Sequence, residues 1–106
     1  MKRGTVVWVD LSDASPPEMG KVRPGIIVSG TAHNEGLSSV VVVPASSIAP
    51  QIWPLRISVG NLAGKESYAV IPGIRQVGKG RLRGAIGQLS NEHLAAIDVC
   101  LEAYLR

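Results

Sequence analysis

The side chains best suited to chemistry in this chain stand where predicted strands meet loops. They are charged or hydroxyl-bearing residues, namely Glu18, Lys21, Arg23, Ser46, Ser47 and Arg75. An arginine can bind two oxygens of one phosphate group, and a hydroxyl can donate a hydrogen bond to a further oxygen. Such a set suits cleavage of RNA by its own 2′-OH, because that reaction needs positioning, charge stabilisation and proton transfer but no protein nucleophile.

Arg23 has the most constrained setting of these residues. In the stretch GKVRPGIIVS it stands directly before Pro24, and a proline restricts the residue before it to extended backbone. The apolar run that follows predicts a buried strand over residues 25–29. Two interpretations of Arg23 fit this pattern: a surface cation that forms an ion pair, or a phosphate ligand held at the mouth of a strand.

The sequence offers little for other reactions. It has no P-loop, no G-x-G-x-x-G followed by a helix and no G-x-S-x-G. Its histidines, His33 and His93, and its single cysteine, Cys100, stand outside any metal-ligand spacing. We therefore expect no metal, no cofactor and no disulfide, and we expect a cytoplasmic protein. No apolar run is long enough to predict a membrane span.

Charge is unevenly distributed along the chain. The formal net charge is +3, and no acidic residue stands between Glu66 and Glu92. That interval contains Arg75, Lys79, Arg81 and Arg83. We call residues 75–83 the basic segment. A segment of one sign attracts polyanions, so it is a candidate surface for nucleic acid. The alternative is a solvated sheet edge that discourages pairing with other strands.

Short apolar runs separated by glycine and proline predict a small β protein. The expected strands cover residues 5–11, 25–29, 40–44, 55–59, 67–74 and 81–89. The fifth is expected to be interrupted near Pro72 and Gly73. The segments 12–22, 30–39 and 45–54 are predicted to be irregular loops, and Trp8 is expected to lie in the core.

Residues 90–106 predict the one long helix. Ser90 is the expected N-cap, and Glu92 falls in the first turn. The expected apolar face consists of Leu94, Ile97, Leu101, Tyr104 and Leu105. The fold class is therefore mainly β with a C-terminal helix, a small curved sheet or barrel in one domain over residues 1–106.

Four stretches, in this order, resemble the MazF/PemK/Kid toxins of bacterial toxin–antitoxin systems. They are KRGTVVWVDL, PEMGKVRPGIIVSG, VVVVPASS and IRQVGKGRLRGAIGQLSNEHL. The resemblance implies an SH3-like barrel, usually a homodimer, that cleaves single-stranded mRNA sequence-selectively without a metal, leaving 2′,3′-cyclic phosphate and 5′-OH ends. It also implies a cognate antitoxin whose acidic C-terminal segment covers the RNA groove.

The resemblance assigns roles residue by residue. Arg23 matches the arginine of the family's Arg-Pro pair and is the expected catalytic cation. Ser46 matches a threonine after the valine run, and Glu18 matches an upstream glutamate; both are also expected to be catalytic. Arg75 matches an arginine of the family's later block and is an expected RNA contact. From their positions in the chain we also expect RNA contacts from Lys21, Ser47, Gln51, Trp53, Lys79 and Arg81, and the alternative for Trp53 is packing against the barrel or a second subunit.

The chain departs from the family pattern at three positions. Gly73, Gln76 and Gly78 stand where the family usually has glutamine, threonine and aspartate. This motivates an alternative, a catalytically degenerate member that binds RNA or antitoxin without cleavage. A gyrase poison like CcdB is disfavoured, because the chain ends in EAYLR and lacks the terminal Trp-Gly-Ile of those proteins.

Overall fold

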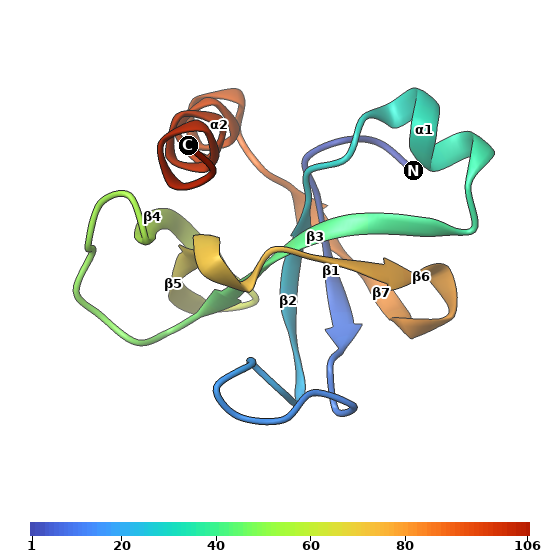
Figure 1. Cartoon of the computed structure of the whole chain (residues 1–106), viewed down its shortest axis with the longest axis horizontal. Coiled ribbons are helices and arrows are strands. Elements are labelled where there is room, and N and C mark those ends of the chain that lie inside the picture. The colour runs from blue at the N-terminus through green and yellow to red at the C-terminus, as the bar shows by residue number, and fades with distance from the viewer.

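Seven antiparallel strands form one strongly curved sheet in a computed structural model of residues 1–106 (Figure 1). The strands are β1 (Thr5–Asp10), β2 (Val22–Ile27), β3 (Ser39–Ser46), β4 (Arg56–Leu62), β5 (Lys65–Val70), β6 (Arg75–Gly78) and β7 (Leu82–Gln88). Their spatial order is β4-β5-β3-β2-β1-β7, and β6 pairs with β3 beside this path. The helices are α1 (Thr31–Gly36) and α2 (Asn91–Tyr104), and Ile71–Gly73 and Lys79–Arg81 form short 3₁₀ turns. The predicted fold class is confirmed.

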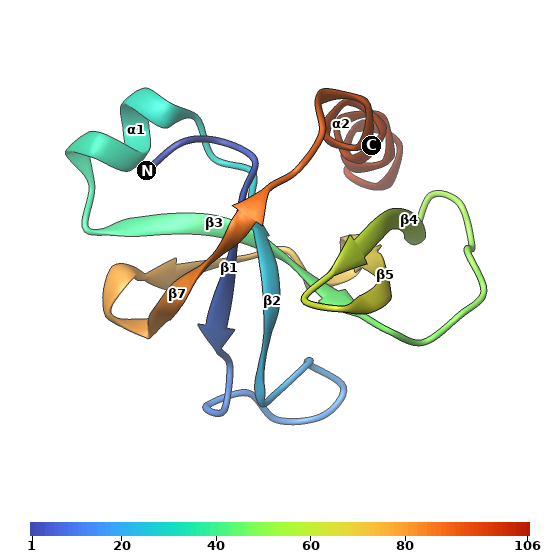
Figure 2. The ribbon, with the colours of Figure 1, turned by 180° about the vertical axis from the view of Figure 1, so that it is seen from behind.

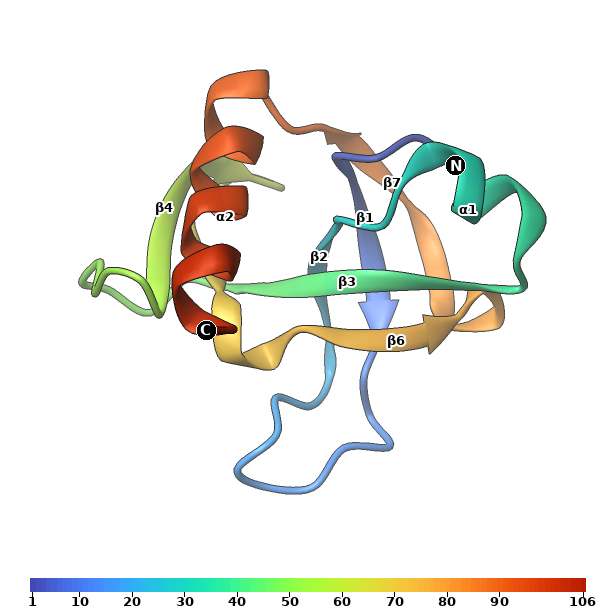
Figure 3. The ribbon, with the colours of Figure 1, turned by 45° about the horizontal axis from the view of Figure 1, so that its top comes forward.

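The long strand β3 organises the sheet. Its first half pairs with β6, which runs beside it in Figure 3. Its last two residues pair with β5, so the partner on that side changes along the strand. Most of its apolar run is buried, as the continuous valines predict. The strand does not alternate apolar and polar residues, because its side chains are buried on both faces of the sheet.

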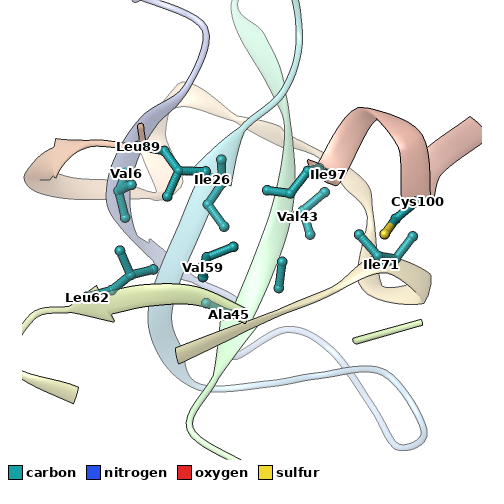
Figure 4. Close-up of a cluster of buried hydrophobic side chains, with 11 residues drawn as sticks. Val6, Ile26, Val43, Ala45, Val59, Leu62, Ile71, Leu89, Ile97 and Cys100 are labelled. Carbon is teal, nitrogen blue, oxygen red and sulfur yellow. The ribbon is translucent and has the colours of Figure 1, made fainter. Parts of the chain in front are cut away.

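Two apolar clusters lie on the two faces of the sheet. Successive residues of a strand point to opposite faces, so Val6 joins one cluster while Val7 and Val9 join the other. The cluster of Val6 also contains Ile97 and Cys100 of α2 (Figure 4). The helix therefore covers one face and closes the curved sheet on that side.

Local signals fix where α2 begins. Ser90 is its N-cap as predicted, and the Ser90 hydroxyl accepts a hydrogen bond from the backbone N–H of His93 at 3.1 Å. The prediction of its apolar face is wrong at the far end. Tyr104 and Leu105 are 40% and 66% exposed, so the buried face of the helix ends before them. Neither helix of the chain is both long enough and apolar enough to cross a membrane.

Two elements differ from the sequence prediction. The segment 30–39 was expected to be irregular but contains α1. The Asn34 side chain, which is buried, donates hydrogen bonds to the carbonyl oxygens of Met1 and Ser29, both at 3.0 Å, and these contacts hold the helical turn. The strand β6 was missed, because its four residues are specified by pairing with β3 rather than by a local pattern.

The start of β2 also differs from the prediction. The strand begins at Val22, so Arg23 and Pro24 lie inside it rather than in the loop before it. Proline is tolerated there because β3 pairs with β2 only from Gly25 onward, which leaves the first residues of β2 at a sheet edge. Trp8 of β1 lies opposite Pro24 of β2 and is 36% exposed, so the prediction that Trp8 lies in the core is wrong.

Candidate active site

Arg23 and Ser46 line one cavity of about 310 Å³. The cavity is lined by residues from the start of β2, the end of β3 and the β4–β5 hairpin. Figure 2 shows these elements on the same side of the molecule. Its polar lining consists of Arg23, Ser46, Ser47, Lys65 and Ser67, and Trp8 forms part of an apolar wall. We call this the Arg23 cavity. Arg23 and Ser46, which the sequence analysis expected to act together, thus line the same cavity.

The Arg23 side chain is half-buried, and a hydrogen bond to the backbone fixes its position. Its Nε donates a hydrogen bond to the carbonyl oxygen of Gly20 at 2.8 Å. Arg23 forms no ion pair with any carboxylate, which removes one of the two interpretations drawn from the sequence. The two terminal nitrogens of the guanidinium remain available for an anion.

Ser46 stands at the last position of β3, opposite Tyr68 of β5. Its hydroxyl oxygen accepts a hydrogen bond from the backbone N–H of Ile48 at 3.1 Å. Because the oxygen is the acceptor, the hydroxyl proton is free to be donated to a ligand. Arg23 and Ser46 therefore offer a charged donor and a neutral donor to one space.

Glu18 lies elsewhere. Together with Arg75 it lines a second cavity of about 330 Å³, between the β1–β2 loop and the 3₁₀ turn at Ile71–Gly73. The Glu18 carboxylate accepts a hydrogen bond from the backbone N–H of Ser15 at 3.4 Å and forms no ion pair. The structure thus does not bring the three expected catalytic residues into one cavity.

Gly73 forms part of the floor of that second cavity. A Cβ at Gly73 would lie 2.6 Å from Cγ of Pro44, closer than real Cβ contacts. The absence of the family's glutamine therefore has a packing reason. Gln76 stands at the next position where the chain differs from the family pattern. Its side chain donates a hydrogen bond to the hydroxyl of Ser39 at 2.8 Å and so links β6 to β3.

Ion pairs neutralise most of the basic segment. Asp13 binds Arg75 at 3.3 Å and Arg81 at 3.0 Å, and Asp10 binds Arg83 at 3.0 Å. The hydrogen bond from Arg75, followed by the charges of both arginines, holds the pKa of Asp13 below its usual value. The basic segment contains no acidic residue in its sequence, but in the folded chain two aspartates lie against its arginines.

The remaining predicted RNA contacts lie outside both cavities. Lys79 donates a hydrogen bond to the backbone carbonyl of Asn34, and the side-chain oxygen of Gln51 accepts one from the N–H of Ser58 at 2.9 Å. Trp53 is 58% exposed in the β3–β4 loop, and Lys21 is exposed with a φ of 69°. These residues are accessible at the surface but are not gathered around Arg23.

Sequence reasoning missed Trp8, Lys65 and Ser67 as cavity residues. Lys65 follows the tight turn at Ala63 and Gly64, and the glycine in LAGK is the only local signal for that turn. Nothing in the sequence places this hairpin beside Arg23, because β4 and β5 reach the site through pairing of β5 with β3. No group of three or more His, Cys, Asp or Glu side chains is arranged to hold a metal ion.

Comparison with known proteins points to one family. The model of the family described as "PemK-like, MazF-like toxin of type II toxin-antitoxin system" matches residues 2–105. Endoribonuclease MazF9 of Mycobacterium tuberculosis is 29% identical over 113 residues, covering 99% of this chain and 96% of that protein. Endoribonuclease EndoA of Bacillus subtilis is 26% identical, covering 99% of this chain and 94% of that protein.

Solved structures show the same architecture. A mycobacterial endoribonuclease in complex with its cognate antitoxin has a TM-score of 0.82 at 25% identity, covering 99% of this chain and 94% of that chain. MazF of Deinococcus radiodurans has a TM-score of 0.87 at 20% identity, covering 99% and 96%. The curved sheet with its terminal helix is thus the fold of these proteins.

Proposed function

We propose that this chain, which belongs to the PemK-like, MazF-like toxins of type II toxin–antitoxin systems, cleaves single-stranded RNA in the Arg23 cavity. The chain is an endoribonuclease and the toxin component of such a system. The observation that carries the site assignment is the joint presence of an unpaired arginine and a hydroxyl donor in one open cavity.

The proposed reaction uses groups already present in the RNA. The 2′-oxygen bonds to the adjacent phosphorus, the bond from phosphorus to the 5′-oxygen breaks, and the strand separates with a 2′,3′-cyclic phosphate and a 5′-OH. The 2′-OH loses its proton and the 5′-oxygen gains one, so no water is consumed. Both protons exchange with solvent through the cavity mouth.

The protein contributes charge and position to this reaction. Negative charge accumulates on the non-bridging phosphate oxygens in the transition state, where the terminal nitrogens of Arg23 and the hydroxyl of Ser46 donate to them. The exposed part of the Trp8 indole offers a face on which an unstacked base can lie. Binding of the base and the phosphate together fixes the scissile group in line.

Four of the other predicted residues have a role in the proposal. Ser47 lies in the same cavity as Ser46 and donates to the same strand of RNA. Arg75 and Arg81 bind phosphates when Asp13 releases them. Glu18 stays a predicted catalytic residue, one that reaches the scissile group only if the β1–β2 loop moves.

The proposed partners follow the same electrostatic logic. A cognate antitoxin with an acidic segment would cover the cationic Arg23 cavity, as suits a toxin inhibited by a polyanionic peptide. The related mycobacterial endoribonuclease was solved with its cognate antitoxin. We further propose a homodimer that acts in the cytoplasm on mRNA without a membrane partner.

The decisive test is incubation of the purified protein with a long unstructured RNA in EDTA, followed by mapping of the 5′ ends. Discrete cuts with 5′-OH ends are expected, lost in Arg23→Ala and retained in Arg106→Ala. Arg106 is the matched control because it binds Glu102 on the exposed end of α2, far from the cavity. Equal cleavage by both variants would refute the site assignment.

One alternative function has a specific observation in its favour. Gly73, Gln76 and Gly78 lack the functional groups that the resemblance expects, and Gln76 is engaged by Ser39. These features are the basis of the alternative, a member that binds RNA or antitoxin without cleavage. Absence of cuts across several RNAs, with tight binding of antitoxin intact, would support this alternative.

A further inference from the structure

We propose that Lys65 binds the RNA phosphate next to the one held by Arg23. The proposal rests on the ribonuclease function argued above and adds a residue that neither the sequence motifs nor the resemblance assigns. Lys65 lines the Arg23 cavity from the β4–β5 hairpin, across from the start of β2. It would thus provide a second cation for the same RNA strand.

The hairpin fixes where the Lys65 side chain begins. Leu62 and Lys65 are directly paired across the turn formed by Ala63 and Gly64. Both turn residues have positive φ, 52° and 83°, which matches the twist of the flanking strands in a two-residue hairpin. Leu62 is only 8% exposed and belongs to the core, so the base of the hairpin is anchored.

The conformation of Ala63 is a second observation at this place. A left-handed φ is unfavourable for a residue with a Cβ, and such residues cluster at functional sites. Ala63 itself lines the cavity beside Lys65. The strained turn therefore sets the edge of the Arg23 cavity and the direction in which Lys65 leaves the backbone.

The charge environment favours an anion at Lys65. Arg75, Arg81 and Arg83 are each bound to an aspartate, whereas Lys65 forms no ion pair. Its acidic neighbour Glu66 accepts a hydrogen bond from the Tyr68 hydroxyl at 3.3 Å.

Strand alternation keeps that acidic neighbour away from the cavity. Lys65 and Ser67 point to the cavity side of β5, and Glu66 points to the opposite side. The ammonium group is thus uncompensated where it meets the cavity.

The chemistry of lysine suits the role of a second phosphate contact. An ammonium group on a flexible stem acts as a point charge and tolerates several positions of the phosphate. Arg23, with its fixed planar fork, would hold the scissile phosphate, and Lys65 would neutralise a neighbour. A contact of this kind contributes to affinity for any sequence and makes that affinity depend on salt.

The test compares Lys65→Gln with Lys2→Gln. Lys2 is exposed, forms no ion pair and lines no cavity, so the two variants lose the same charge at different places. Binding of a non-cleavable 2′-O-methyl RNA is measured over a series of salt concentrations. We expect the slope of log Kd against log salt concentration to become shallower by about 0.7 in Lys65→Gln, the loss of one phosphate contact to a single strand. Lys2→Gln should keep the wild-type slope, and Lys65→Arg should restore it.

The outcomes separate this proposal from the one on which it rests. If the wild-type protein binds RNA and Lys65→Gln has the same slope, Lys65 contacts no phosphate and the inference is overturned alone. If the wild-type protein neither binds nor cleaves any RNA, both the proposed function and the inference about Lys65 are refuted. A slope that becomes equally shallow in both variants would show a general charge effect and would also overturn the assignment of Lys65.

Discussion

Replacing Asp13 with asparagine should strengthen the binding of RNA. The carboxylate of Asp13 binds Arg75 at 3.3 Å and Arg81 at 3.0 Å, so it occupies two guanidinium groups at once. Asparagine has nearly the same shape but no charge, so it no longer competes with phosphate for these cations. Both arginines would then be free to bind the RNA backbone.

The size of the effect follows from the number of cations released. Each newly neutralised phosphate of a single strand steepens the slope of log Kd against log salt concentration by about 0.7, so two arginines steepen it by up to about 1.4. Stability should change little, since the Asp13 side chain is 41% exposed and surface ion pairs contribute weakly to folding. Binding and stability therefore respond differently to the same substitution.

Fluorescence anisotropy with a labelled 2′-O-methyl RNA over a salt series would measure this slope. Asp98→Asn is the matched control, because Asp98 of α2 binds Arg3 near the N-terminus, so this substitution releases an arginine outside the basic segment. An Asp13→Asn slope equal to that of the wild type would refute the reasoning. Weaker binding would refute it too, and would mean that the ion pairs support the RNA site rather than block it.

Other predictions concern packing and pH. Gly73→Ala should destabilise the fold by about 1–3 kcal/mol in urea unfolding, because the new Cβ meets Pro44 at 2.6 Å; no loss would mean that the 3₁₀ turn shifts freely. Ile97→Ala should cost about 2–5 kcal/mol, since Ile97 is fully buried, while Val99→Ala on the exposed face should cost far less; equal losses would contradict the packing of α2. The hydrogen bond from Arg75 and the charges of the two arginines lower the pKa of Asp13. The ion pairs of Asp13 therefore stabilise the fold above pH 3.8, and this stabilisation is lost as the pH falls through the lowered pKa of Asp13. Asp13 stays charged from about pH 5 to 8, so the difference in RNA affinity between the wild type and Asp13→Asn should be constant over that range.

Local patterns predicted most of the regular structure. The valine run of β3 and the N-cap of α2 carry their own signals, and both appear as expected, whereas the apolar face of α2 was predicted too far toward the end of the helix. The helix α1 depends instead on hydrogen bonds from Asn34 to Met1 and Ser29. Contacts from the far end of the chain cannot be read from the spacing of residues 30–39.

The site divides in the same way. The Arg-Pro pair drew attention to Arg23 and the residues after the valine run to Ser46, and the resemblance assigned a role to each. The structure places both in one cavity, and their roles stay predictions. The position of Glu18 depends on how the β1–β2 loop folds over the 3₁₀ turn, and Lys65 reaches the cavity only through strand pairing. Residues brought in by long-range contacts were the ones that sequence reasoning misplaced or missed.

Charge shows most clearly why sequence and space differ here. The basic segment appeared to be a broad surface for polyanions, but Asp10 at the end of β1 and Asp13 in the loop after it, both far away in the sequence, bind three of its arginines. Two cations without an acidic partner, Arg23 and Lys65, meet in the Arg23 cavity. Low-dielectric walls focus the field of such cations, so a phosphate is drawn to the cavity rather than along the sheet edge. Affinity for RNA should accordingly depend steeply on these two positions, and it should spread over the basic segment only when Asp13 loses its charge.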